Sequence, residues 1–171
     1  MKLIKLAIIS FIVLFLIITS IGLLLPSTVR VTRNITIHVP QDTLYRYISD
    51  VKYWKLWMDM AKNSTVTFIS KKTAGAGTKA MIGNQRIDIT SATKNEIVTV
   101  WQAGNGRYQT GVFQLAGDST TASTNLNWYF EQKLNWYPWE RISAISSDKI
   151  IGPGMEQGLD SLKAIFEGGS K

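Results

Sequence analysis

Residues 122–134 read A-S-T-N-L-N-W-Y-F-E-Q-K-L, the longest clean alternation of apolar and polar side chains in the chain. Leu126, Trp128 and Phe130 are separated by single asparagine or tyrosine residues. Successive side chains of a β-strand point to opposite faces, so this period of two predicts a long strand with one face against a core. The fold must supply a partner layer for that apolar face.

Five shorter strands are expected upstream of this one, because apolar residues alternate between turn signals there. Glycine, asparagine or aspartate stands at the connections, as in Gly83-Asn84 and Lys94-Asn95, and these residue types favour tight turns. Strands joined by tight turns run antiparallel. The expected strands cover residues 65–70, 78–82, 85–93, 96–103 and 108–115.

Helical patterns flank these strands on both sides. A further strand at 29–39 ends before Pro40, and short helical segments follow as far as Met58. The C-terminal stretch has helical spacing, with Pro153 in the expected first turn and Gly168-Gly169 as the stop. The order of strand, short helices, six strands and amphipathic helix predicts an α+β domain whose bent sheet wraps the last helix. The apolar face of that helix contains Met155, Leu159, Leu162 and Phe166.

Composition narrows the chemistry. The chain has 171 residues, no cysteine and one histidine. The lack of cysteine excludes a disulfide scaffold, a thiolate zinc site and a cysteine nucleophile. His38 alternates with Ile37 and Val39, which predicts a solvent-exposed side chain. The acidic residues fall mostly at turns, helix starts and outward strand positions, and no pair is placed for acid–base catalysis. We therefore expect no catalytic residue, no metal and no cofactor.

Residues 6–25 form an uncharged apolar run, with 16 apolar side chains out of 20. A helix of that length spans about 30 Å, the thickness of the hydrocarbon core of a bilayer. A cleavable signal peptide has a shorter apolar region, of about 7 to 15 residues, that ends in small residues. This run ends in L-L-L-P, so we interpret residues 1–25 as an uncleaved single-pass anchor and residues 26–171 as the soluble domain.

The anchor sets the expected location and partners. Lys2 and Lys5 precede the span and Arg30 and Arg33 follow it, so the positive-inside comparison is nearly balanced. The short basic amino-terminal tail favours a domain on the extracytoplasmic side. Beyond residue 25 the chain has 17 Lys and Arg against 12 Asp and Glu, and these basic residues are scattered. We therefore expect a membrane surface as the partner and no nucleic acid.

Several segments, taken in order, resemble a known superfamily. They are R-N-I-T-I at 33–37, L-Y-R-Y-I-S-D at 44–50, W-x-x-W at 54–57, G-x-G at 75–77 and G-P-G-M-E-Q-G-L-D-S-L-K at 152–163. Together they resemble the START-like, or SRPBCC, superfamily, in particular its polyketide cyclase/dehydrase and lipid-transport branch. The resemblance implies a helix-grip fold, in which a curved seven-stranded antiparallel sheet surrounds the long C-terminal helix. One departure is Met58-Asp59-Met60, where the family usually has an aromatic-Ser-Pro segment.

The resemblance also implies an apolar cavity between the sheet and the C-terminal helix. We expect Trp54 and Trp57, three residues apart on one helical face, at its mouth. For each of these residues the alternative is that the side chain only fills the core. The expected lining residues are Trp101, Phe113, Trp128 and Phe130 on the sheet and Met155, Leu159, Leu162 and Phe166 on the helix.

Three functions remain open from the sequence. The first is a membrane-anchored module that binds a lipid or other hydrophobic small molecule without catalysis. The second is a cyclase or dehydratase that uses the same cavity and needs polar groups in it, for example Asp88, Tyr108 or Gln109. The third is an envelope or stress protein that binds another protein through the sheet or through the aromatic stretch W-Y-P-W at 136–139.

Overall fold

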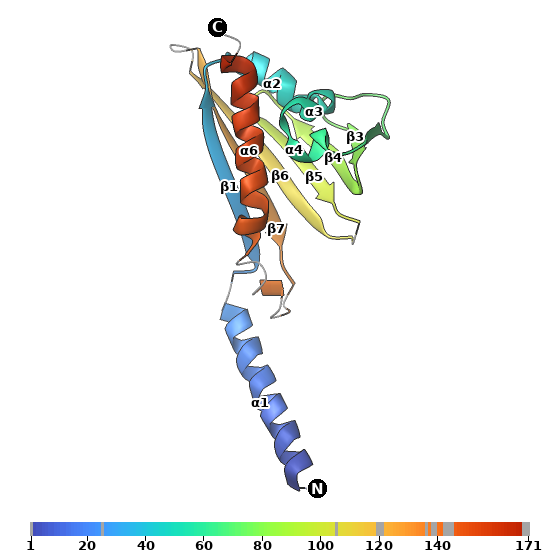
Figure 1. Cartoon of the computed structure of the whole chain (residues 1–171), viewed down its shortest axis with the longest axis vertical. Coiled ribbons are helices and arrows are strands. Elements are labelled where there is room, and N and C mark those ends of the chain that lie inside the picture. Colours follow the sequence, from blue (N-terminus) through green and yellow to red (C-terminus); the bar gives the residue numbers. More distant parts are fainter. Residues whose placement is uncertain are drawn as a thin grey trace.

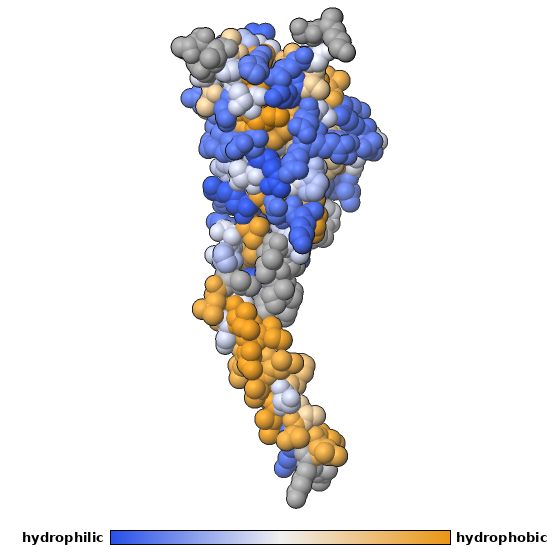
Figure 2. Space-filling view, turned by 60° about the vertical axis from the view of Figure 1, so that its left-hand side comes forward, coloured by the Kyte–Doolittle hydropathy of each residue, from blue (hydrophilic) through white to orange (hydrophobic). Residues whose placement is uncertain are grey.

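A long helix and a sheet-and-helix domain make up the molecule (Figure 1). The computed structural model describes residues 2–24, 26–104, 106–118, 122–135, 137, 140–141 and 146–168. Helix α1 (Lys2–Leu24) extends away from the domain and leads into its first strand. On the face shown in Figure 2, α1 is mostly apolar, whereas the surface of the domain is mostly hydrophilic. Residues Leu3–Leu24 are long and apolar enough to cross a membrane, a test that a signal sequence also passes.

One antiparallel sheet of seven strands forms the domain, in the order β1-β7-β6-β5-β4-β3-β2. This arrangement confirms the predicted helix-grip fold. The strands are β1 (Thr28–Ile37), β2 (Val66–Phe68), β3 (Lys79–Ile82), β4 (Gln85–Ala92), β5 (Glu96–Gln102), β6 (Tyr108–Asp118) and β7 (Ser123–Lys133). The helices that the described residues form in the domain are α2 (Gln41–Ser49), the 3-10 turn η1 (Val51–Tyr53), α3 (Trp54–Trp57), α4 (Asp59–Lys62) and α6 (Ser147–Glu167).

Strand β7 has the faces that its sequence predicts. Leu126, Trp128 and Phe130 are buried, and the residues between them are partly or fully exposed. The strand pairs with β1 on one side and with β6 on the other. β7 is the second strand of the sheet, and its buried Trp128 lies beneath α6, where a Cβ atom on Gly158 would lie 3.5 Å from the ring.

Helix α6 begins earlier than its sequence predicts. It starts at Ser147, so Pro153 lies inside the helix and not in its first turn. A proline there removes one backbone hydrogen bond, because its nitrogen carries no proton. The earlier turns are held by a tertiary contact with Arg33 of β1, which sequence spacing did not reveal.

Arg33 joins β1 to the first half of α6 through two carboxylates. Its Nη1 lies 2.8 Å from Oδ1 of Asp148, and its Nε lies 2.6 Å from Oε1 of Glu156. A Cβ atom on Gly152 would lie 2.2 Å from Nη2 of Arg33, so glycine leaves the space that the guanidinium occupies. The hydrogen bond from Arg33 lowers the pKa of Asp148, and the bonds to Asp148 and Glu156 raise the pKa of Arg33.

This ion pair predicts a dependence of stability on pH. Because the pKa of Asp148 is lowered from 3.8 in the folded chain, its contribution is complete above that value and is lost as the pH falls through the folded pKa. Asp148→Asn removes this contribution while keeping an acceptor for Arg33. We expect the melting temperature of the full chain in non-ionic detergent to fall more steeply than that of the variant as the pH is lowered from about 5 through the folded pKa of Asp148. Parallel curves would contradict the assignment.

Several elements meet at the end of the sheet that is nearest α1, here called the α1 end. β1 begins there and β7 ends there, since Thr28 pairs with Lys133. The registers then place the start of β6, the end of β5 and the start of β4 at the same end. Helix α6 runs parallel to β1, because Arg33 contacts Asp148 and His38 contacts Glu167. The first turns of α6 therefore also lie at the α1 end.

Gly111 of β6 allows close packing on the concave face. A Cβ atom there would lie 2.7 Å from Oγ1 of Thr99, 2.8 Å from Cε1 of Phe130 and 2.9 Å from Nε1 of Trp101. These three atoms belong to side chains fixed by buried neighbours. Any side chain at position 111 must therefore push the core apart.

We predict that Gly111→Ala destabilises the full chain by about 1–3 kcal/mol, the usual cost of overpacking a core. Chemical denaturation in detergent, followed by far-ultraviolet circular dichroism, measures this difference. Gly154→Ala is the matched control, because a Cβ atom at Gly154 would meet nothing within 4 Å. In a helix that replacement is expected to be neutral or to stabilise by up to about 1 kcal/mol. Equal stability of Gly111→Ala and the parent would refute the packing argument.

Candidate functional site

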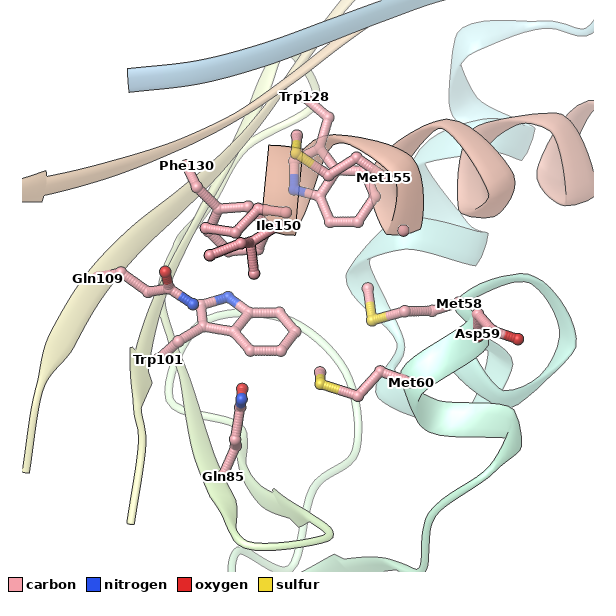
Figure 3. A pocket seen from close by; sticks show the side chains of 12 residues that line it. Met58, Asp59, Met60, Gln85, Trp101, Gln109, Trp128, Phe130, Ile150 and Met155 are labelled. Carbon is pink, nitrogen blue, oxygen red and sulfur yellow. The ribbon is translucent and has the colours of Figure 1, made fainter. Parts of the chain in front are cut away.

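A pocket of about 310 Å³ lies on the concave side of the sheet (Figure 3). Its size is at the lower end of the range of about 300–1,000 Å³ typical of small-molecule sites. Strands β4 to β7, the segment around α4 and the first half of α6 supply its walls. The lining residues are Met58, Asp59, Met60, Gln85, Trp101, Gln109, Trp128, Phe130, Ile150, Ile151, Gly154 and Met155.

The pocket lies at the α1 end of the domain. Gln85 is the first residue of β4, Trp101 is next to the last residue of β5, and Gln109 is the second residue of β6. Ile150 comes from the first turns of α6, and its side chain is 76% exposed. The same end of the sheet that receives the chain from α1 therefore carries the pocket.

Trp101 forms one wall of the pocket and also belongs to the core. Its ring stacks on that of Trp54 at a centroid distance of 5.7 Å and meets Phe130 edge-on at 5.3 Å. Its indole N–H donates to Oγ1 of Thr99 at 2.8 Å, and that hydroxyl donates to the carbonyl of Gly111 at 2.7 Å. These bonds fix the orientation of the indole, because they satisfy its polar atom inside an apolar environment.

Four of the eight expected lining residues surround the pocket: Trp101, Trp128, Phe130 and Met155. Phe113, Leu159 and Leu162 are buried in the core away from its lining. Phe166 is partly buried and meets Tyr47 edge-on at 4.8 Å. That any of these residues touches a ligand remains a prediction.

Trp54 and Trp57 lie in the core and not at the mouth of this pocket. Both side chains are fully buried. The indole of Trp54 donates to the carbonyl of Ile48 at 2.8 Å, and the ring of Trp57 meets that of Trp128 edge-on at 5.7 Å. Their spacing of three residues does place them on one face of a helical turn, but that face packs on the sheet. The same spacing fits a core face and a cavity mouth equally well.

The sequence interpretation missed two groups of pocket residues. Met58 and Met60 belong to the segment that departs from the superfamily pattern, and this segment forms part of the pocket wall. The departure was therefore a signal in the sequence for these lining residues. Ile150 and Ile151 were missed because the helix was expected to start at Pro153. Ile151 lies four residues before Met155, so the helical spacing already extended upstream of the proline.

The pocket wall offers little for acid–base chemistry. Within its described lining, Asp59 is the one titratable side chain, and Figure 3 shows its carboxyl group directed away from Trp101. Asp88 is engaged by Arg86, whose Nε lies 3.1 Å from Oδ1. Tyr108 is 60% exposed and lines a neighbouring groove with Gln109. Of the groups proposed for an enzyme, Gln109 alone lies in the pocket.

The histidine and the aromatic stretch 136–139 that the sequence singles out do not contribute to the described lining of the pocket. His38 is exposed as predicted, and its Nδ1 lies 2.8 Å from Oε1 of Glu167. The backbone N–H of His38 also donates to this carboxylate and is the main cause of its lowered pKa. Within the described ranges, no three acidic or histidine side chains gather to hold a metal ion. Of the aromatic stretch 136–139, all but Tyr137 lies outside the described residues.

Solved structures with low sequence identity share this architecture. A START superfamily protein from Mycobacterium smegmatis gives a TM-score of 0.60 at 14% identity, over 81% of this chain and 97% of that one. A protein from Nitrosospira multiformis gives 0.64 at 12% identity, over 80% of this chain and 95% of that one. CalU16 from Micromonospora echinospora gives 0.58 at 15% identity, over 83% and 76% of the two chains.

No family model and no curated protein sequence matches the chain. The match to solved structures therefore shows the fold, and the chain has the START-like helix-grip fold that its sequence predicts.

The double role of Trp101 generates a prediction about stability. Trp101→Phe removes the hydrogen bond to Thr99 and part of the ring that stacks on Trp54. We expect a loss of about 1–3 kcal/mol in the free energy of unfolding, measured by chemical denaturation of the full chain in detergent. Tyr108→Phe is the control, because that exposed ring should change stability by less than about 0.5 kcal/mol. Equal effects of the two substitutions would show that Trp101 is not held as described.

Proposed function

We propose that the protein is a membrane-anchored module that binds a lipid or other hydrophobic small molecule in the pocket between the sheet and α6. The observation that carries this proposal is the position of the pocket at the α1 end. An apolar pocket there lies next to the layer in which apolar ligands dissolve, if α1 spans a bilayer.

The short connection to α1 supports the same function. Residues 25–27 alone separate α1 from β1, and three residues reach at most about 10 Å. A tether of that length keeps the pocket within reach of the bilayer surface and raises the effective concentration of a membrane-dissolved ligand. Lys2 and Lys5, which precede the uncharged run of residues 6–25, support a domain on the extracytoplasmic side.

The side chains that line the pocket favour binding of a ligand over catalysis. Aromatic rings and thioethers dominate its walls, and such groups bury apolar area without offering a nucleophile or a base. The carboxyl group of Asp59 is directed away from Trp101 (Figure 3). The pocket therefore suits holding and releasing an apolar molecule.

The proposal is tested by filling the pocket from its helical wall. Gly154→Trp places an indole where a Cβ atom meets nothing within 4 Å and where the backbone lines the pocket. The full chain, purified from membranes in mild detergent, is analysed by native mass spectrometry for bound small molecules. We expect an apolar molecule on the parent protein and its loss from Gly154→Trp.

Gln157→Trp is the matched control, because Gln157 is an exposed residue of α6 outside the pocket lining. Both variants retain α1, so molecules that associate with the apolar helix are the same in each. The control should keep the bound molecule. The same set of bound molecules in all three proteins, or none in any, would overturn the proposal.

A further inference from the structure

We propose that the ligand of this pocket is an uncharged amphipathic molecule whose polar end is a hydroxyl, carbonyl or amide group bound by Gln85 and Gln109. This inference rests on the proposed function and adds the class of ligand. The argument comes from the polar groups that line the pocket and from the charges that are missing among them.

Two side-chain amides face the apolar walls. Gln85 and Gln109 enter from the α1 ends of β4 and β6, and Figure 3 shows both extending toward the indole of Trp101 from two sides. Both residues are half-buried. Among the described residues, no hydrogen bond joins either amide to another group of the protein. Each amide has donors and an acceptor, so the pair is suited to a ligand group that donates, accepts or does both.

Trp101 does not compete for these amides. Its indole N–H is already used by Thr99 at 2.8 Å. The thioethers of Met58, Met60 and Met155 are at most weak acceptors. Trp128 also lines the pocket, and its buried Nε1 has no hydrogen-bond partner among the described residues, so it is one further N–H donor in the wall. The two glutamines are the lining side chains that can both donate to and accept from the uncharged polar end of a ligand.

The charges in and near the pocket disfavour an anionic ligand. No Lys, Arg or His is among the described lining residues, and Asp59 adds a carboxyl group at the edge. A carboxylate or phosphate placed there would be desolvated without a counter-ion, which is costly. Arg86 is engaged by Asp88 at 3.1 Å. Arg107 lines the neighbouring groove, with Nη2 at 3.9 Å from Oε1 of Glu140.

The apolar walls select weakly, so the polar end decides specificity. Methionine side chains are flexible and polarizable, and they adapt to ligands of different shape. Three methionines line this pocket, two of them from the segment Met58–Met60. A wall of this kind accepts many apolar skeletons, whereas the two amides accept a narrower set of end groups.

The test compares two photoactivatable probes with the same alkyl chain, a diazirine fatty alcohol and the corresponding fatty acid. The full chain in nanodiscs of phosphatidylcholine is irradiated with each probe at about pH 9, where a fatty carboxyl group is ionised. Mass spectrometry of peptides then measures labelling of the pocket segments. We expect the alcohol to label the pocket at least about fivefold more than the acid, as expected from lost hydrogen bonds and an unpaired charge.

Substitution of the glutamines assigns the preference. In the double variant Gln85→Leu and Gln109→Leu, which roughly keeps side-chain volume, labelling by the alcohol should fall at least about threefold, because its hydroxyl loses both amide partners. Labelling by the acid should stay low, because its charge is unpaired in both proteins. Gln85→Lys should act in the opposite sense and raise labelling by the acid, because it adds a cation to the pocket. A gain of this kind cannot arise from misfolding. Circular dichroism of each variant checks the fold.

The outcomes separate this inference from the proposed function. Equal labelling of the pocket by both probes overturns the inference and leaves a hydrophobic ligand in place. Undiminished labelling by the alcohol in the double leucine variant overturns the role of the two amides. Labelling of the pocket by neither probe overturns the proposed function, and the inference falls with it.

Discussion

The packing of Trp128 against its aromatic neighbours is the contact on which the rest of the structure depends. Its ring stacks on Phe113 at 5.0 Å, meets Trp57 edge-on at 5.7 Å and lies 5.4 Å from Phe130. Helix α6 crosses this cluster at Gly158, where a Cβ atom would lie 3.5 Å from Trp128. The side chain of Trp128 thus contacts residues of the sheet, of the short helix α3 and of α6. Its burial therefore holds these three parts of the domain together. Trp128 belongs both to the hydrophobic core and to the wall of the pocket.

The two halves of α6 serve different purposes because their side chains differ. In the later half, Leu159 and Leu162 are buried and fill the space above the sheet. In the earlier half, Gly152 accommodates Arg33, and Gly154 leaves open space beside the pocket. A helix with bulky residues throughout would have closed the domain at both ends. The pocket therefore lies where glycines leave space along the helix and where the ion pairs of Arg33 add to the apolar packing of Ile151 and Met155.

Sequence patterns predicted the fold more fully than the site. Alternation in the strand around Trp128 and tight-turn residues between strands are local signals, and each corresponds to a strand in the structure. The start of α6 was not predicted, because the ion pair of Arg33 with Asp148 joins residues far apart in sequence. Trp54 and Trp57 were expected at the mouth of the cavity but lie in the core. Their spacing shows that they share one face of a helix, but it does not show what that face packs against. Gln85 was missed for the same reason, because a glutamine at the start of a strand has no periodic signature.

The direct passage from α1 into β1 has a mechanical consequence. A pull applied through α1 enters the domain at Thr28 and runs along β1, which pairs with β7 from Thr28 to Ile37. Force along the strands loads all the hydrogen bonds of that ladder in shear, so they share it instead of opening one after another. Arg33 lies within this loaded strand and holds the first half of α6. Tension on the connection is thereby carried by the ladder between β1 and β7 and is transmitted to the helix that borders the pocket.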